Sequence, residues 1–226
     1  MNLLIVSASS KEINLLKENL TLVQKRDSYF SEYIYGKTYI DFLVSGVGIA
    51  STCYQLGKFI SKKKYDLIIN LGIAGAFHKT LKIGQVVHVT FDIFSELGAE
   101  NDTDFIPFDL LPIDQLTQTR TAYRIENTNP IDSSVVNELQ QVNGITVNTI
   151  HGNEKSIADA ISLFSPDIES MEGAAFLYVC KEEQIKCAQI RAISNYVEKR
   201  NRNNWDVDLA IKNLTETALR LLNSIN

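Results

Sequence analysis

Acidic and amide side chains stand beside predicted strand ends in three separate parts of this chain of 226 residues. Glu12 follows a strand predicted over 3–8, Glu172 opens a predicted helix, and Asn195 ends a predicted strand. Ligands of α/β sheets bind beyond the carboxyl ends of the strands, so we expect these groups to meet there. Carboxylates at such an edge can act as a general base or stabilise positive charge.

Each of these residues also has a purely structural interpretation. Ser9 and Glu12 have the S-x-x-E spacing of a capping box, which satisfies the first N–H groups of a helix. Glu172 lies in the first turn of a helix, where the dipole favours a carboxylate. Asn195 at a strand end is typical of a turn, and Met171 is typical of core packing. The residue pattern alone leaves both interpretations open.

Glycine-containing turns are predicted after two other strands, at 46–48 and 72–75, where glycine allows a ligand to approach the backbone closely. The first is not a dinucleotide fingerprint, because Ser51 replaces the third glycine and no acidic residue ends the next strand. The sequence contains neither a G-x-x-x-x-G-K-[ST] phosphate-binding motif nor a G-x-S-x-G nucleophile elbow. We therefore expect no nicotinamide or other organic cofactor.

The composition, 45% hydrophobic and 22% charged, is that of a globular protein. A net charge of −5 with one dense basic run, at 62–64, argues against nucleic-acid binding. Three cysteines without a CxxC pair and three scattered histidines indicate neither a disulfide framework nor a metal site, and suit a reducing cytoplasm. The apolar runs are too short for a signal peptide or a membrane span. We expect a cytoplasmic protein.

Short apolar runs alternate with helical patterns, which predicts an α/β fold with a largely parallel or mixed sheet. The segment from 92 to about 119 is irregular, so we expect a functional or interfacial role for it. Because there is no repeat, linker or low-complexity tract, residues 1–226 are expected to form one domain. We expect strands over 3–8, 30–35, 39–45, 66–71, 85–91, 144–150 and 187–194, and helices over 10–23, 48–64, 153–164, 171–184 and 207–222.

Five segments occur in the order found in a known family of purine nucleosidases and phosphorylases. From residue 3 to the C-terminus the sequence resembles the methylthioadenosine/S-adenosylhomocysteine nucleosidases of that family. The resemblance implies one α/β domain of the nucleoside phosphorylase type, with a twisted mixed central sheet partly closed into a barrel and flanked by helices. It also implies a homodimer or higher homo-oligomer. The segments are Val44–Gly48, Ile69–Gly75, Leu81–Val87, Met171–Ala175 and Arg191–Asn195.

Three further segments, Leu97–Glu100, Glu169–Gly173 and Asn195–Trp205, resemble the futalosine hydrolase branch of that family. The resemblance implies an N-glycosyl hydrolase that releases hypoxanthine and dehypoxanthine futalosine from futalosine in menaquinone biosynthesis. Futalosine is an inosine-like nucleoside whose 5′ end carries a carboxyphenyl ketone. Two alternatives stay open: a nucleosidase for methylthioadenosine, S-adenosylhomocysteine or aminodeoxyfutalosine, and a non-catalytic nucleoside-binding protein on the same fold.

The resemblance also implies roles for the residues around the sugar. Glu12 would be the general base for water, and Glu172 would bind the ribose hydroxyls beside the developing positive charge. Met171 would pack against the ribose, with Gly72 and Ile73 beneath it. Because an apolar Ile73 and a carboxylate disfavour a phosphate dianion, we expect water to be the nucleophile.

At the base, Asn195 stands where adenine-specific members of the family carry Asp. An amide cannot act as an acid, but it can donate a hydrogen bond to O6 or N7, which suits hypoxanthine. Either His151 or Ile150 would stack on the purine, and Val47 would also contact the substrate.

At the 5′ end of the substrate, Trp205 would pack on the aryl group and Arg200 or Arg202 would pair with its carboxylate. The alternative is an exposed, charged loop with an aromatic anchor. The segment from 97 to 108 would line the 5′ pocket of a neighbouring subunit.

Overall fold

A mixed β-sheet forms the centre of the molecule, and the computed structural model describes residues 1–111 and 123–225. The sheet runs in the order β11-β10-β6-β12-β5-β1-β4-β3-β2, with β9 paired to β6, while β7 and β8 form a separate hairpin. The strands are β1 (Asn2–Ser7), β2 (Thr21–Lys25), β3 (Phe30–Tyr35), β4 (Thr38–Val44), β5 (Leu67–Ala76), β6 (Val86–Phe94), β7 (Gly98–Asn101), β8 (Asp104–Pro107), β9 (Arg124–Glu126), β10 (Gln140–Thr146), β11 (Ile168–Ser170) and β12 (Cys187–Tyr196).

One end of the sheet closes on itself. The short strand β11 pairs with β10 and also with the far half of β5, where Glu169 lies opposite Gly75. Strands β5, β12, β6, β10 and β11 therefore form a closed ring, and the remaining strands continue from β5 as an open sheet. This confirms the predicted α/β fold with a partly closed mixed sheet.

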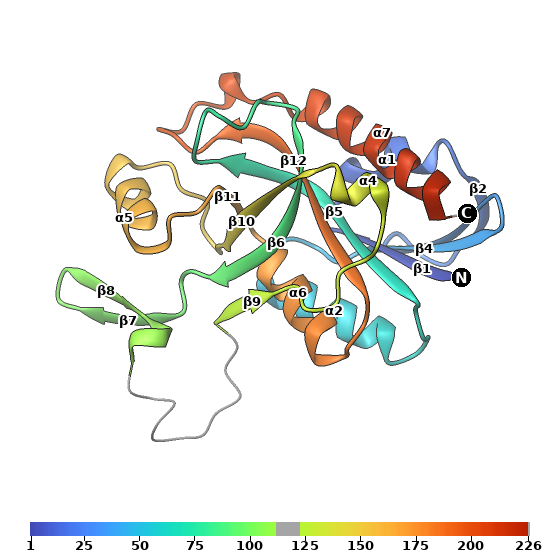
Figure 1. Ribbon diagram of the computed structural model, residues 1–226, viewed down its shortest axis with the longest axis horizontal. Coiled ribbons are helices and arrows are strands. Elements are labelled where there is room, and N and C mark those ends of the chain that lie inside the picture. Colours follow the sequence, from blue (N-terminus) through green and yellow to red (C-terminus); the bar gives the residue numbers. More distant parts are fainter. Residues whose placement is uncertain (112–122, 226) are drawn as a thin grey trace.

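Helices cover both faces of the open sheet (Figure 1). Successive β1 side chains point to opposite faces. Leu3 packs in a cluster with residues of α1 and α7, and Leu4 packs in a cluster with residues of α2 and α6. Full burial of such side chains stabilises the fold by about 1.5–3 kcal/mol each. The helices are α1 (Ser10–Lys17), α2 (Ile49–Ile60), α4 (Ser134–Asn137), α5 (Glu154–Phe164), α6 (Gly173–Glu182) and α7 (Val207–Ile225), with 3-10 turns η1 (Phe108–Leu110) and η2 (Arg202–Asn204).

The first helix is shorter than the pattern predicts. It ends at Lys17, and the residues expected to complete it, to position 23, instead form the edge strand β2. The side chain of Asn19 donates to the carbonyl of Leu15 at the helix end, and β2 gains the antiparallel ladder of β3. Leu22 and Val23, at the end of the expected helix, are both more than half exposed.

The segment expected as a turn at 72–75 instead continues strand β5. A Cβ atom at Gly72 would lie 2.7 Å from Nη1 of Arg191, and one at Gly75 would lie 3.0 Å from Cγ2 of Val197. Glycine at these positions therefore serves close packing within a strand and does not reverse the chain.

The segment expected to be irregular from 92 to about 119 is ordered in part. Its first residues belong to β6, and the hairpin β7–β8 and η1 follow (Figure 1). The part of this expectation that covers 112–119 lies outside the described residues. Within the described chain, no helix is long and apolar enough to cross a membrane. Cys53, Cys180 and Cys187 are free thiols.

Candidate active site

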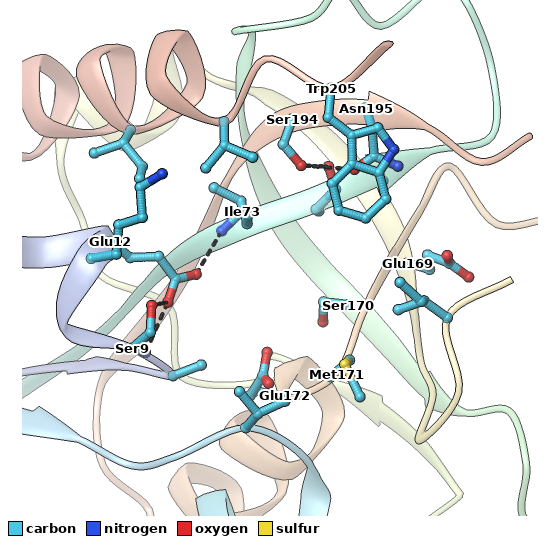
Figure 2. A pocket seen from close by; sticks show the side chains of 18 of the residues that line it. Ser9, Glu12, Ile73, Glu169, Ser170, Met171, Glu172, Ser194, Asn195 and Trp205 are labelled. Carbon is cyan, nitrogen blue, oxygen red and sulfur yellow. Dashed lines mark hydrogen bonds between the residues drawn. The ribbon is translucent and has the colours of Figure 1, made fainter. Parts of the chain in front are cut away.

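A cavity of about 260 Å³ lies where the carboxyl ends of several strands meet (Figure 2). Eight of the residues singled out in the sequence line it, whereas Gly72, Arg200 and Arg202 do not. Ile150, the second candidate for stacking on a base, also lines it. The eight are Glu12, Val47, Ile73, His151, Met171, Glu172, Asn195 and Trp205.

Glu12 is fixed at one wall of the cavity by four hydrogen bonds. Its Oε2 accepts from the Ser9 backbone N–H at 2.9 Å, from Ser9 Oγ at 2.7 Å and from Ser7 Oγ at 3.0 Å. Its Oε1 accepts from the N–H of Ile73 at 3.1 Å. The capping box is therefore present, and the same carboxylate still lines the cavity. The structural and the chemical interpretation of Glu12 are compatible.

Glu172 is the N-cap residue of α6 and is only 8% exposed. Its Oε1 accepts a hydrogen bond from the N–H of Gly48 at 3.0 Å. Burial raises the pKa of this carboxyl, Arg191 and the Gly48 N–H oppose that rise, and the charge of Glu12 adds to it. Figure 2 shows Glu172 and Glu12 as separate groups on the wall of one cavity.

Arg191, which was not singled out from the sequence, lies behind both carboxylates and is 1% exposed. Its guanidinium donates to Oδ1 of Asn70. Gly72 has no side chain, which leaves room for the Arg191 guanidinium. A Cβ at this position would lie 2.7 Å from Nη1 of Arg191 and 3.1 Å from Oε1 of Glu12. Burial lowers the pKa of Arg191, and Glu172 and Glu12 oppose this. A charged residue within an apolar strand was the signal that could have identified it.

At another end of the cavity, Asn195 and Glu169 lie on either side of Gly75. A Cβ at that glycine would be 3.1 Å from Nδ2 of Asn195 and 3.6 Å from Cγ of Glu169. Ser194 Oγ donates to Oδ1 of Asn195 at 2.8 Å, and Nδ2 donates to the carbonyl of Tyr196 at 3.0 Å. The amide oxygen thus already accepts one hydrogen bond, and one N–H of Nδ2 is left for a ligand.

Glu169, which the sequence pattern did not mark as a site residue, is 4% exposed and lines the cavity. Its Oε2 lies 2.6 Å from Nδ1 of His151, and its Oε1 accepts from the backbone N–H of His151 at 3.1 Å. The hydrogen bond to Glu169 raises the pKa of His151, against the effect of burial. Two contacts thus tie one histidine to one carboxylate.

Trp205 lines the cavity together with Val207 and Ile211, at the start of α7. Arg200 lies outside this wall, with its guanidinium 5.8 Å from the Trp205 ring centre, and Arg202 is an exposed residue of η2. Lys11 is the cationic side chain on the cavity wall. Its Nζ lies 3.1 Å from Oδ1 of Asp208, and both side chains are largely exposed, so this ion pair is weak.

A buried polar network supports α6, which carries Glu172 at its N-cap. Thr146 Oγ1 donates to Asp92 Oδ1 at 2.8 Å and accepts from the N–H of Ala174 at 2.7 Å. Gln189 Nε2 donates to Asp92 Oδ2 at 2.9 Å. Burial raises the pKa of Asp92 to about 6, although the hydrogen bonds from Gln189 and Thr146 oppose the rise.

The cavity thus combines a fixed carboxylate, a second carboxylate near a buried arginine, and an amide donor. Such a set can activate a nucleophile and stabilise positive charge on a bound ligand. Among residues 1–111 and 123–225, no group of three His, Cys, Asp or Glu side chains is arranged to hold a metal ion.

Comparisons with known proteins agree with this architecture. A family model described as the phosphorylase superfamily matches residues 2–225. A futalosine hydrolase of Acidothermus cellulolyticus is 29% identical over 77% of this chain and 71% of its own. A 5′-methylthioadenosine/S-adenosylhomocysteine nucleosidase of Bacillus subtilis is 27% identical over the whole of both chains. The native structure of futalosine hydrolase of Helicobacter pylori has the same fold, with a TM-score of 0.81, 17% identity and 99% and 97% coverage.

Proposed function

The chain belongs to the phosphorylase superfamily and is an N-glycosyl hydrolase of the nucleosidase type, and we propose that its substrate is futalosine. The observation that carries this proposal is the placement of Glu12 and Glu172 on the wall of one cavity, next to a buried arginine. Hydrolysis of an N-glycosidic bond needs an activated water and stabilisation of an oxocarbenium-like sugar. Two carboxylates around one bound sugar can supply both.

In the proposed reaction, Glu12 accepts the proton of a water that attacks C1′ of the ribose. The hydrogen bonds from Ser9 and Ile73 hold this carboxylate in place, so its orientation is fixed before the substrate arrives. Glu172 binds the ribose hydroxyls, and its negative charge lies beside the positive charge that develops on the sugar. Met171 packs against the ribose.

Water is favoured over phosphate by the charges around this part of the cavity. Arg191 is the cation near the two catalytic carboxylates, and Glu172, Glu12 and Asp92 all interact with its charge. Ile73, which faces the cavity, offers no donor from its side chain. A phosphate dianion would therefore meet two carboxylates without an unpaired cation to hold it.

Hypoxanthine is favoured at the base end by the orientation of Asn195. Ser194 donates to the amide oxygen, which leaves an N–H of Nδ2 to donate to O6 of a 6-oxopurine. A 6-aminopurine presents a donor at position 6, which the amide nitrogen cannot accept. Ile150 lines the cavity and supplies an apolar surface on which the purine packs.

The aryl group at the 5′ end is proposed to pack on Trp205, with Val207 and Ile211 completing an apolar wall. The guanidinium of Arg200 lies over the same indole, and Lys11 lines the cavity. We assign the substrate carboxylate to these two cations. Arg202 is exposed on η2 and does not line the cavity.

A second subunit is part of the proposal. The hairpin β7–β8 stands away from the central sheet in Figure 1. Its exposed position supports the expectation that it reaches the 5′ pocket of a neighbouring copy in a homodimer. The free thiols of the three cysteines suit the cytoplasm, where we expect the enzyme and a menaquinone pathway to operate.

Nucleoside hydrolysis with the pure protein tests this function. Futalosine, aminodeoxyfutalosine, methylthioadenosine and inosine are each incubated with the enzyme, with and without phosphate, and the free base is quantified. The proposal predicts hypoxanthine release from futalosine at a rate that phosphate does not change. Release that needs phosphate, or a clear preference for methylthioadenosine, would contradict it.

One observation favours a second candidate, a nucleosidase for methylthioadenosine, S-adenosylhomocysteine or aminodeoxyfutalosine. Relatives with the name 5′-methylthioadenosine/S-adenosylhomocysteine nucleosidase align over the full chain, while the futalosine hydrolase relatives align over about four fifths. Asn195 is the residue that argues against an adenine base. A non-catalytic binding protein is disfavoured because Glu12 and Glu172 are both held in place by backbone donors.

A further inference from the structure

No residue has yet been assigned to protonate the departing purine in the proposed reaction. Departure of the purine places an electron pair on its ring system, and protonation of a ring nitrogen makes it a far better leaving group. The amide of Asn195 can donate a hydrogen bond, but it has no proton to transfer. A group with an exchangeable proton is therefore needed near the base end of the cavity.

The pair formed by His151 and Glu169 has the geometry of such a group. A carboxylate can only accept, so Nδ1 of His151 carries the proton that is shared across 2.6 Å with Glu169. The backbone N–H of His151 donates to the same carboxylate and fixes the loop as well. This arrangement leaves Nε2 as the nitrogen that exchanges a proton, and within the described residues no group forms a hydrogen bond with it.

The pair also lies at the correct end of the cavity. Glu169 and Asn195 both lie next to Gly75, and His151 lines the same cavity as Asn195. Phe77 stands edge-on to the imidazole, with 6.2 Å between ring centres, and limits how far the ring can turn. A purine that accepts a hydrogen bond from Asn195 would therefore lie in the cavity that the imidazole of His151 also lines.

The charges around His151 favour its protonated form. Glu169 on β11 and Glu96, in the loop after β6, both raise its pKa, and burial opposes them. Glu96 is itself held by the backbone N–H groups of Asn148 and Thr149. Arg200 approaches from the other side through its backbone and Cβ, next to Gly152, while its guanidinium lies over Trp205.

We propose that His151, oriented by Glu169, is the general acid that protonates the departing purine. This inference rests on the proposed nucleosidase function. In one step the water oxygen bonds to C1′, and the C1′–N9 bond breaks with its electron pair passing to the purine. Nε2 of His151 gives its proton to N7, while the water gives a proton to Glu12. Proton exchange with solvent then restores both residues, so one water is consumed for each base released.

Variants of both residues test the assignment. His151→Gln should lower kcat for the purine nucleoside by about a hundredfold or more, the usual range for loss of a general acid. The leaving group of 4-nitrophenyl riboside departs without a proton. The fold-decrease in kcat for this substrate should therefore be less than one tenth of the fold-decrease for the purine nucleoside. Glu169→Gln should move the alkaline limb of the kcat profile to lower pH, and His151→Gln should remove that limb. His78→Gln is the matched control, because His78 is exposed and outside the cavity.

Three results would overturn the assignment. They are an unchanged kcat in His151→Gln, an equal loss with both leaving groups, and an alkaline limb that neither variant moves. If 4-nitrophenyl riboside is not cleaved by the wild type, the pH profiles decide alone. The substrate proposal fails separately: if the wild type cleaves another purine nucleoside and not futalosine, the same variants are tested on that nucleoside. An enzyme that cleaves no nucleoside contradicts both.

Discussion

The backbone N–H of Gly48 donates a 3.0 Å hydrogen bond to Oε1 of Glu172, a residue 124 positions further along the chain. The contact joins the loop after β4 to the N-cap of α6. Gly48 has a φ of 96°, a backbone conformation that residues with a side chain rarely adopt. The position of a proposed catalytic carboxylate therefore depends on a glycine in a distant turn.

Substitution of that glycine should weaken both stability and turnover. A Cβ at Gly48 would have nothing within 4 Å, so Gly48→Ala acts through φ alone, at a cost of about 1–2 kcal/mol. We expect a lower melting temperature and a lower kcat for futalosine. Gly57→Ala is the matched control, because Gly57 lies within helix α2 with open space around it, and alanine there should stabilise by about 0.5–1 kcal/mol. An equal response to both substitutions would contradict the strain argument.

Glu12→Gln should abolish most of the activity without unfolding the protein. Glutamine keeps an oxygen that can accept from the N–H of Ile73, but it cannot take a proton from water. Loss of a general base lowers kcat by about 10²–10⁴-fold. Single-turnover assays measure this, while calorimetric titration with hypoxanthine should give a dissociation constant close to that of the wild type. A kcat within threefold of the wild type would rule out the assigned role of Glu12.

Asn195→Asp should move the preference from inosine-type toward adenosine-type nucleosides. A protonated carboxyl can give a proton to N7 and its oxygens can accept from a 6-amino group, whereas an amide has no proton to give and its oxygen already accepts from Ser194. The measurement is the ratio of kcat/KM for futalosine and aminodeoxyfutalosine, and we expect it to change by at least tenfold. A ratio that stays constant would show that Asn195 does not select the base.

The cations near the 5′ end should affect binding more than chemistry. Arg200→Ala and Lys11→Ala should each raise KM for futalosine by about threefold to tenfold, while kcat and the KM for inosine change little. The difference arises because inosine has no carboxylate at this end. Arg202→Ala is the comparison, since Arg202 lies on the exposed turn η2. If neither Arg200 nor Lys11 changes KM for futalosine, the carboxylate is bound elsewhere.

Asp92 should make stability depend on pH in a defined direction. Its pKa is about 6 in the folded protein and 3.8 as an ordinary value, so the folded state binds the proton more tightly. The contribution is fully present below about pH 3.8 and is lost as the pH rises through 6. This difference between the two pKa values corresponds to about 3 kcal/mol over the full range of pH.

Denaturant unfolding at pH 4, 5.5 and 7 tests this for the wild type and Asp92→Asn. The free energy of unfolding of the wild type should fall relative to the variant by about 2 kcal/mol from pH 4 to pH 7, because part of the effect is already lost at pH 4. A difference that is constant with pH would mean that Asp92 titrates with an ordinary pKa.

The alternation of strands and helices could be predicted from the sequence because hydrophobic periodicity determines it. The same periodicity placed Glu12 and Asn195 beside strand ends and Glu172 at the start of a helix. The end of α1 could not be predicted, because the competing strand β2 owes its existence to pairing with β3. Tertiary pairing of this kind overrides local propensity.

Two site residues were missed for a different reason. Arg191 lies in a strand that reads as apolar, and its charge is accommodated only because Glu12 and Glu172 come from elsewhere in the chain. Glu169 gains its partner, His151, through the short strand β11, which the pattern did not predict. Contacts between segments that are distant in the sequence cannot be predicted from local hydrophobic periodicity.

Strand β5 fixes the distance between the sugar end and the base end of the cavity. Its N–H at Ile73 contacts the carboxylate at the sugar end, and Gly75, two residues on, lies beside the amide and the carboxylate at the base end. Successive residues of a strand are about 3.3 Å apart, so the spacing between these two ends is set at about 7 Å by a hydrogen-bonded backbone. A change of base can therefore be accommodated by exchanging side chains, whereas a longer or shorter sugar–base unit would require a different strand.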